Sequence, residues 1–170
     1  MSERTGDRPG VDADGTGDID ADTADNTDGG GTDDYRLVFE NRVRVAETDR
    51  AGIVFYGEYV TFQDEAVSAY RREMGFDSAH AEAAGWSTRV VSTTVDYHDS
   101  ARFEEVLENE VRVGTIGETS VTYDWRVSRE RDGRLLADGS VTQVFVDDET
   151  GEPIRVPDAF REAVTDFQAS

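Results

Sequence analysis

Cysteine and lysine are both absent from this chain of 170 residues. Without cysteine the chain can form no disulfide, no thiolate metal site and no cysteine nucleophile. It also lacks any run of about 18 apolar residues, and no basic patch followed by an apolar region opens the N-terminus. We therefore expect one soluble domain without a targeting segment, working in the cytoplasm.

Basic residues are scarce, since 17 arginines stand against 38 acidic residues, for a formal net charge of −21. Such a surface repels nucleic acids and anionic membranes, so neither is an expected partner. The charge is consistent either with a cationic partner or with adaptation to a high-salt cytoplasm, where salt screens self-repulsion. Because the acidic residues are spread over the whole chain, we favour the second interpretation and expect a halophilic protein.

The N-terminal segment, residues 1–34, holds eleven acidic residues, two arginines and no aromatic residue. It cannot bury enough apolar surface to offset the entropy lost on ordering. We expect a disordered acidic tail that acts as a solubilising extension, with a regulatory role as the alternative. The folded domain is then expected over residues 35–170.

Hydrophobic periodicity predicts the elements of this domain. Apolar residues alternate over residues 37–45, which is the period of a strand. They then recur every three or four residues over 59–74, the period of a helix that Gly75 would end. Four further strands are expected, approximately at residues 88–97, 103–114, 118–129 and 134–146.

Turn signals connect these elements into an α+β domain. Asp132-Gly133 is typical of a tight hairpin, and residues 114–117 form a looser one. Pro157 is expected to open a short final helix that runs through Phe167. Consecutive hairpins make the later strands antiparallel, and the one long helix must cover a sheet face. The other face, or a sheet edge, would stay available for a second subunit.

The stretch most informative about chemistry combines a carboxylate, a glycine turn, a short apolar run and a helix start. Asp49 is expected in the loop ahead of the helix, and Tyr56 and Gly57 as the first helical residues. The first N–H groups of a helix lack partners within it and carry the positive end of its dipole. A nucleophile or base placed opposite such donors is half of an acyl-transfer site. The alternatives are a turn aspartate and an ordinary helix start.

The residues between the carboxylate and the helix fit a reactive site. Gly52 permits a close approach of the backbone, and residues 53–55 would place an apolar wall beside the Asp49 carboxylate. Burial against such a wall would favour a reactive carboxylate over a solvated one.

Other titratable residues carry weaker signals. Asp64 and Glu65 lie on the predicted helix, where either could act as a second acid, but solvent-facing carboxylates fit better. His80 and His98 are the only histidines; His98 could act as a general base at a strand end, but a surface turn fits better. The sequence contains no visible metal-ligand set and no phosphate-binding glycine loop, so no metal site is expected.

The segment 44–59 resembles the acyl-CoA thioesterase family typified by 4-hydroxybenzoyl-CoA thioesterase, which has the hotdog fold. The likeness rests on the pattern D-x-x-G-I-V-x-Y, and it covers roughly residues 36 to 160. Beyond this pattern it continues through the helix and the following positions: Gly75, Asp96, Tyr97, Asp138, Gly139, Val146, Asp147, Ile154 and Pro157.

The resemblance implies a five-stranded antiparallel sheet wrapped around one long helix, with subunits paired edge to edge in a homodimer or homotetramer. Acyl-CoA would occupy a groove at the subunit interface, and because CoA is part of the substrate no separate cofactor is implied. Asp49 falls on the family's catalytic aspartate, either nucleophile or general base, and Tyr56 on the position whose backbone N–H polarises the thioester carbonyl. The substrate would border Gly52, Ile53, Val54, Phe55, Gly57 and Tyr59.

This chain also departs from the family pattern. Many relatives carry histidine at the position of Tyr56. Gly57 and Glu58 also differ from the commoner residues at the helix start. Ser100 replaces a proline that is frequent after the tyrosine at the strand end. The changes at the helix start bear on the acyl preference, because these side chains border the acyl pocket. Arginines are expected to meet the CoA phosphates, and the candidates are Arg89, Arg102, Arg126 and Arg155.

Three functions remain to be separated. The leading hypothesis is hydrolysis of an acyl-CoA thioester to the free acid and CoA. A second keeps the fold but hydrates or dehydrates an acyl thioester, which usually needs a His–acid pair that the motif does not offer. A third is a non-catalytic dimer that binds acyl-CoA.

Overall fold

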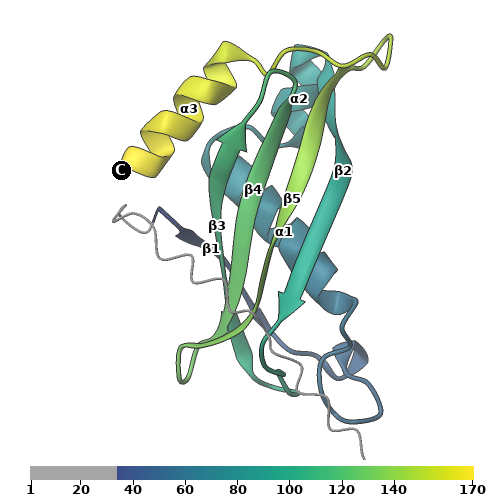
Figure 1. The fold of residues 1–170 in the computed structure, drawn as a ribbon, viewed down its shortest axis with the longest axis vertical. Coiled ribbons are helices and arrows are strands. Elements are labelled where there is room, and N and C mark those ends of the chain that lie inside the picture. Colours follow the sequence, from purple (N-terminus) through teal and green to yellow (C-terminus); the bar gives the residue numbers. More distant parts are fainter. Residues whose placement is uncertain (1–33) are drawn as a thin grey trace, which may run out of the picture. The chain divides into compact units, whose positions relative to one another are not determined.

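The structure is a computed structural model that describes residues 34–170, so the predicted tail lies outside the described residues apart from Asp34. A short 3₁₀ turn, Val45–Glu47, precedes the long helix. In chain order the elements are β1 (Arg36–Arg42), α1 (Glu58–Glu73), α2 (Ser78–Ala84), β2 (Trp86–Tyr97), β3 (Val106–Ile116), β4 (Ser120–Arg129), β5 (Arg134–Asp147) and α3 (Asp158–Ala169) (Figure 1).

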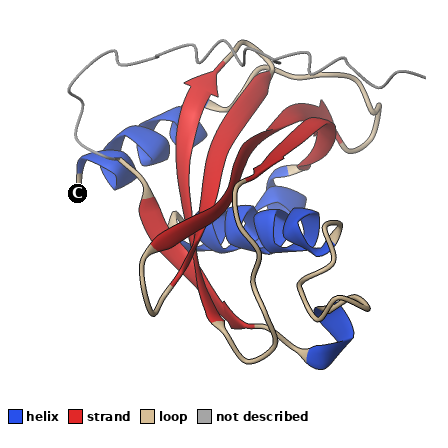
Figure 2. Cartoon of the chain, turned by 60° about the horizontal axis from the view of Figure 1, so that its bottom comes forward, coloured by secondary structure: helices blue, strands red, loops and turns tan. Residues whose placement is uncertain are grey.

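The five strands form one antiparallel sheet in the order β1-β3-β4-β5-β2. Two hairpins place β3, β4 and β5 side by side in the centre. The strands on either side of α1 in the chain, β1 and β2, form the two edges. Figure 2 shows α1 lying against one face of the sheet. The predicted α+β architecture, a five-stranded antiparallel sheet around one long helix, is confirmed.

The core lies between α1 and the sheet, as the two periodicities require. On α1 the buried side chains recur at Tyr59, Phe62, Ala66 and Tyr70. Alternate side chains of β4 are fully buried on the helix side, and the largest is Trp125. The one polar group of this side chain, the indole Nε1–H, donates to the Asn109 Oδ1 atom at 3.1 Å.

The sheet face that points away from α1 is polar. Here Arg126 pairs with Glu110 through N–O contacts of 2.8 and 3.0 Å, and Arg112 pairs with Asp124 at 2.9 Å. The Tyr35 ring stacks against both guanidinium groups, at 4.2 Å from Arg126 and 4.8 Å from Arg112. This face therefore holds cross-strand ion pairs in place of an apolar layer.

Several predicted boundaries shift. The first strand ends at Arg42, because the chain then turns into the 3₁₀ segment, in which Glu47 accepts the Arg44 N–H at 2.8 Å. The second strand begins at Trp86, two residues earlier than predicted, and the third runs from Val106 to Ile116 instead of 103–114. The fourth begins at Ser120, the fifth reaches Asp147, and the final helix extends to Ala169.

The short helix α2 was not predicted from the hydrophobic pattern. It is defined by its caps: the Asp77 carboxylate accepts the His80 N–H at 2.9 Å, and Gly85 ends the helix at φ +78°. Seven residues are too few to show a clear helical period. The sequence signal for this helix is the pair of its caps, an aspartate at its start and a glycine eight residues later.

Strand β2 is an open edge with an irregular course. Its pairing with β5 shifts between Val90 and Ser92, and the side chains of Val90 and Val91 are 54% and 60% exposed. Farther along, the backbone of Thr94 approaches Gly139 so closely that a Cβ atom there would overlap the Thr94 carbonyl oxygen. Gly139 therefore lets the backbones of β2 and β5 approach closely at this point of their pairing.

Candidate active site

The Asp49 loop is a tight turn closed by backbone hydrogen bonds. Thr48 and Val54 form an antiparallel bridge, and the Asp49 N–H donates to the Ile53 carbonyl at 2.8 Å. The Gly52 N–H donates back to the Asp49 carbonyl at 3.0 Å. Gly52 has φ +74°, a left-handed conformation that glycine adopts without the steric cost of a Cβ atom. The glycine of the motif thus shapes the loop that carries the carboxylate.

The Asp49 side chain is held on one side and open on the other. Its Oδ1 atom accepts the Ala51 N–H at 2.7 Å, while Oδ2 has no hydrogen-bond partner within residues 34–170. The side chain is exposed in the single chain. The contact of Oδ1 with the Ala51 N–H is the turn geometry that the sequence analysis kept as an alternative. The Oδ2 atom stays available for chemistry.

The predicted apolar wall beside Asp49 does not form within the single chain. Val54 is 4% exposed and packs into the core, whereas Phe55 is 45% exposed, because neighbouring residues on this extended segment point to opposite sides. Ile53 is half-buried, and its backbone bridges to Arg102. The carboxylate is therefore not buried by its own loop, and any burial must come from groups other than residues 34–170 of the same chain.

The helix start lies just beyond the loop. The helix α1 begins at Glu58, so Tyr56 and Gly57 precede it instead of opening it as predicted. The Glu58 N–H donates to the Phe55 carbonyl at 2.9 Å. Within the described part of the chain, neither the Tyr56 N–H nor the Gly57 N–H donates to a protein acceptor. These two N–H groups are the free donors at the positive end of the helix.

The loop and the helix start lie at the same end of α1. Asp49 pairs with Ile53 across the loop, and Ile53 precedes Tyr56 by three residues, an extended reach of roughly 10 Å. The Phe55 N–H also donates to the Glu47 carbonyl at 2.8 Å, which ties the end of the loop to its beginning. The fold thus places the carboxylate loop and the free N–H groups at the same end of α1. That the two face one another across a bound thioester stays a prediction.

An aromatic cluster surrounds this helix end. The Tyr97 hydroxyl, at the end of β2, donates to the Tyr56 carbonyl at 2.9 Å. The Tyr97 ring meets the Tyr59 ring edge to face, with centroids 5.5 Å apart, and the Phe55 and Tyr56 rings lie 4.5 Å apart. Tyr56 is 68% exposed and Tyr59 only 2% exposed. Of the predicted substrate-binding residues, Val54 and Tyr59 therefore belong to the core, while Phe55 and the two glycines lie nearer the surface.

Histidine and carboxylate do meet in this structure, but elsewhere. The His98 Nε2 atom lies 2.7 Å from the Asp138 Oδ1 atom, and both side chains are about half exposed. Tyr97 contacts α1, and Ala137 is fully buried. Their neighbours in sequence, His98 and Asp138, accordingly lie on the sheet face that points away from α1. No sequence pattern indicated this pair, because it joins the residue after β2 to a residue of β5, about 40 positions apart in the chain.

The remaining titratable candidates are peripheral. Asp64 and Glu65 are exposed on α1, as expected. His80 is exposed on α2, with its ring 4.6 Å from that of Phe76. No group of three or more histidine and acidic side chains able to hold a metal occurs in residues 34–170. No helix in the same range is long and apolar enough to cross a bilayer.

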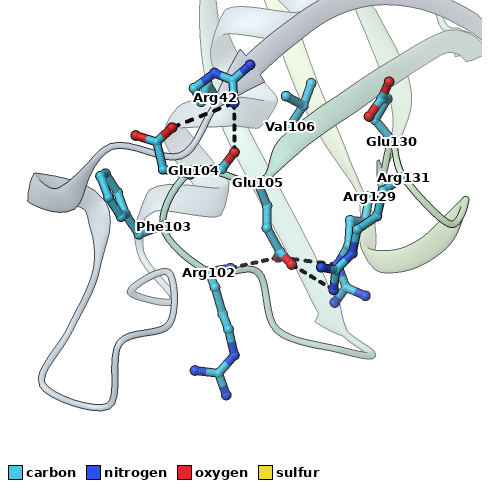
Figure 3. Close-up of a pocket in the computed structure, with 9 residues that line it drawn as sticks. All are labelled: Arg42, Arg102, Phe103, Glu104, Glu105, Val106, Arg129, Glu130 and Arg131. Carbon is cyan, nitrogen blue, oxygen red and sulfur yellow. Dashed lines mark hydrogen bonds and ion pairs between the residues drawn. The ribbon is translucent and has the colours of Figure 1, made fainter.

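A pocket lies where the end of β1, the start of β3 and the end of β4 meet. It has a volume of about 550 Å³ and is lined by Arg42, Arg102, Phe103, Glu104, Glu105, Val106, Arg129, Glu130 and Arg131 (Figure 3). Most of its charges are paired: Arg131 contacts Glu105 at 2.8 Å, and the buried Arg129 contacts Glu105 at 3.3 Å. The pocket contains neither Asp49 nor Tyr56.

The four arginines considered for CoA phosphates now separate into two pairs. Arg126 is paired and stacked on the outer face, and Arg155 contacts Asp158 at 3.1 Å. The guanidinium groups of Arg89 and Arg102 form no ion pair or hydrogen bond within residues 34–170. Figure 3 shows the Arg102 side chain pointing away from the paired arginines of the pocket. Arg102 also adjoins the Asp49 loop through its backbone bridge to Ile53.

Comparisons with known proteins identify the family of this chain. Residues 43–164 match the model of a family described as the thioesterase-like superfamily. Over 116 residues the chain is 28% identical to a protein of Escherichia coli named acyl-CoA thioester hydrolase YbgC, covering 68% of this chain and 86% of that protein. It is 24% identical over 131 residues to the putative acyl-CoA thioesterase YneP of Bacillus subtilis, covering 77% and 91%.

A solved structure extends the likeness to the fold. The DHNA-CoA thioesterase of Staphylococcus aureus superposes with a TM-score of 0.71 at 28% identity, covering 79% of this chain and 91% of that chain. The matched family region includes the Asp49 loop, α1 and all of β2 to β5. The carboxylate loop and the helix start therefore lie within the region that matches the family model.

Proposed function

Because the chain belongs to the thioesterase-like superfamily and has the hotdog fold, we propose that it hydrolyses an acyl-CoA thioester to the free acid and CoA. One observation carries this proposal most directly. The Asp49 loop leaves one carboxylate oxygen without a hydrogen bond in residues 34–170. It leads directly into a helix end at which the Tyr56 and Gly57 N–H groups have no acceptor in the same residues. An attacking group and donors for a developing oxyanion are the two parts that acyl transfer requires.

The proposed reaction uses these parts as follows. The thioester oxygen accepts the Tyr56 N–H, which stabilises the charge that develops on it. The Asp49 Oδ2 atom then either attacks the carbonyl carbon or takes a proton from a water that attacks it. The carbon–sulfur bond breaks and CoA leaves as a thiol after protonation. In the first route, water then hydrolyses the acyl-aspartyl anhydride and restores the carboxylate.

Two other functions fit the observations less well. Hydration or dehydration of an acyl thioester would need a His–acid pair near the helix end. The pair that exists, His98 with Asp138, lies on the opposite sheet face from α1. A dimer that only binds acyl-CoA would not need an oriented carboxylate with one free oxygen.

A thiol-release assay tests the proposal. Purified full-length protein in concentrated KCl, chosen because we propose that its acidic surface is adapted to a high-salt cytoplasm, is mixed with aliphatic and aromatic acyl-CoAs. Release of free CoA with catalytic turnover supports hydrolysis. Tight acyl-CoA binding without release on any member of the panel would favour the binding dimer, and conversion of the acyl chain with the thioester intact would favour hydration.

We propose that the active form is a homodimer or homotetramer in which β2 pairs with a second copy and covers Asp49. Support comes from the position of β2 at the edge of the sheet, where Val90 and Val91 are exposed and residues 90–95 include no charged residue and no proline. Asp49, exposed in one chain, would gain the missing apolar surroundings from the partner.

Replacing Val91 by glutamate is expected to halve the native mass, because two like charges would meet across the paired edges. Multi-angle light scattering measures the mass of the native and variant proteins. The matched control is Leu37→Glu on the opposite edge strand β1, where Leu37 is 49% exposed and the variant should keep the native mass. An unchanged mass for Val91→Glu, or a halved mass for Leu37→Glu, would contradict pairing through β2.

We also propose that Arg102 contacts a phosphate of the CoA portion, because its guanidinium is free and its backbone adjoins the Asp49 loop. Arg102→Gln should raise KM about tenfold and leave kcat unchanged, since one charge-assisted hydrogen bond contributes about 1.5 kcal/mol. Steady-state kinetics with acyl-CoA and with the corresponding S-acyl pantetheine, which lacks the nucleotide, measure the effect. The pantetheine substrate should not distinguish native from variant enzyme.

The control for this experiment is Arg155→Gln, because Arg155 is already paired with Asp158. It should leave KM unchanged with both substrates. An equal rise in KM for acyl-CoA and acyl-pantetheine in Arg102→Gln would show that Arg102 shapes the site without meeting a phosphate.

A further inference from the structure

The peptide group between Tyr56 and Gly57 is held by the hydroxyl of Tyr97, the last residue of the edge strand β2. Two donors reach the Tyr56 carbonyl: the Tyr97 hydroxyl at 2.9 Å and the Tyr59 N–H at 3.4 Å. The second contact is longer than usual for an N–H···O bond, so the phenol is the stronger of the two. Tyr97 thus orients this peptide group more strongly than the helix does through the Tyr59 N–H.

Fixing this carbonyl also fixes the N–H group of the same peptide. In a trans peptide the C=O and N–H bonds point in opposite directions within one plane, and no cis peptide occurs in residues 34–170. The Gly57 N–H must therefore point away from the Tyr97 hydroxyl. The preceding peptide, between Phe55 and Tyr56, is fixed in the same way, because the Phe55 carbonyl accepts the Glu58 N–H at 2.9 Å. The Tyr56 N–H therefore points in the opposite direction, away from the body of the helix.

Tyr97 is itself held firmly enough to serve as an anchor. Its backbone pairs with Ala137 on β5, and its ring packs edge to face against the buried Tyr59 ring. The close approach of Thr94 to Gly139 holds the end of β2 tightly against β5 in the sheet. Burial raises the pKa of the Tyr97 hydroxyl above its ordinary value, with Tyr56 as a lesser cause, so the hydroxyl keeps its proton at neutral pH and can donate it.

We propose that Tyr97 is a positioning residue that aims the Gly57 N–H, beside the Tyr56 N–H, at the oxygen of the reacting thioester. The oxyanion site then contains two backbone donors, one oriented by the helix and one oriented by the hydroxyl at the end of β2. This assignment rests on the proposed hydrolysis and adds a residue that lies 41 positions from its hydrogen-bond partner in the sequence.

Tyr97→Phe tests the assignment, because it keeps the ring against Tyr59 and removes only the hydroxyl. We expect kcat to fall about tenfold, equivalent to 1.4 kcal/mol of transition-state stabilisation, with KM unchanged. The matched control is Tyr70→Phe, which removes a hydroxyl that donates to Gln168 at 3.0 Å near the other end of α1. It should lower thermal stability and leave kcat unchanged.

Backbone NMR provides a readout that does not depend on turnover. Tyr97→Phe should shift the Tyr56 carbonyl carbon and the Gly57 amide resonances, and Tyr70→Phe should shift neither. An active native enzyme with unchanged kcat in Tyr97→Phe overturns the positioning role alone, as do unshifted Tyr56 and Gly57 resonances. A native enzyme that releases no thiol from any acyl-CoA overturns the proposed function, and with it the catalytic part of this assignment.

Discussion

Replacing Asp49 by asparagine is expected to lower kcat at least about a thousandfold while the protein keeps its fold. An amide neither attacks a thioester nor accepts a proton from water, and loss of a reacting group typically costs three or more orders of magnitude. The fold should survive, because the amide oxygen of asparagine can accept the Ala51 N–H just as the Asp49 Oδ1 atom does. Thiol release from a good substrate, together with thermal unfolding, measures both effects.

The control is Asp64→Asn, on the exposed face of α1, which removes the same charge without touching the loop. It should keep native kinetics and stability. Hydrolysis near the native rate in Asp49→Asn would reject the proposed mechanism. A strongly lowered melting temperature in that variant would mean that the main role of Asp49 is to stabilise the turn through its hydrogen bond with the Ala51 N–H.

Gly139→Ala is expected to destabilise the protein by roughly 3 kcal/mol and to lower turnover as well. The added methyl group would overlap the Thr94 carbonyl oxygen, and a backbone neighbour cannot rotate out of the way. The end of β2 must then move away from β5, which loosens the Tyr97 hydroxyl from the Tyr56 carbonyl. Chemical denaturation and steady-state kinetics on the same preparation measure the two effects.

Gly117→Ala is the matched control. A Cβ atom at Gly117 would also meet a close neighbour, but this is the Ser120 hydroxyl, a side-chain atom that can rotate aside. We expect a loss of well under 1 kcal/mol and native kcat. If Gly139→Ala proved as stable as Gly117→Ala, the close packing of β2 against β5 would not be a real constraint on the site.

The fold was largely predictable because each element carries its own periodicity. The long helix shows apolar residues every three or four positions, and β4 alternates so regularly that its inward residues are all buried. Prediction failed where local signals were short or were overruled. The helix α2 is defined by caps alone, and the 3₁₀ turn at Val45–Glu47 ends β1 earlier than its alternating pattern indicates.

The candidate site was predictable only in part. The order of Asp49, Gly52 and the helix start is local, so the sequence could place a carboxylate loop ahead of a helix end. The exposure of Asp49 was not predictable, because it depends on surfaces that the loop itself does not supply. Nor could sequence choose among four arginines, since their availability depends on cross-strand partners such as Glu110 for Arg126.

The sequence by itself determined the acidic surface, the strand and helix periods, and a carboxylate held by a glycine turn just before a helix. These are properties of composition and of residues within a few positions of one another. Only the tertiary structure decided that β2 is an open edge, that His98 and Asp138 meet away from the helix, and that Tyr97 holds the peptide between Tyr56 and Gly57. Each of these depends on contacts between residues tens of positions apart, which strand order and packing create and local spacing does not encode.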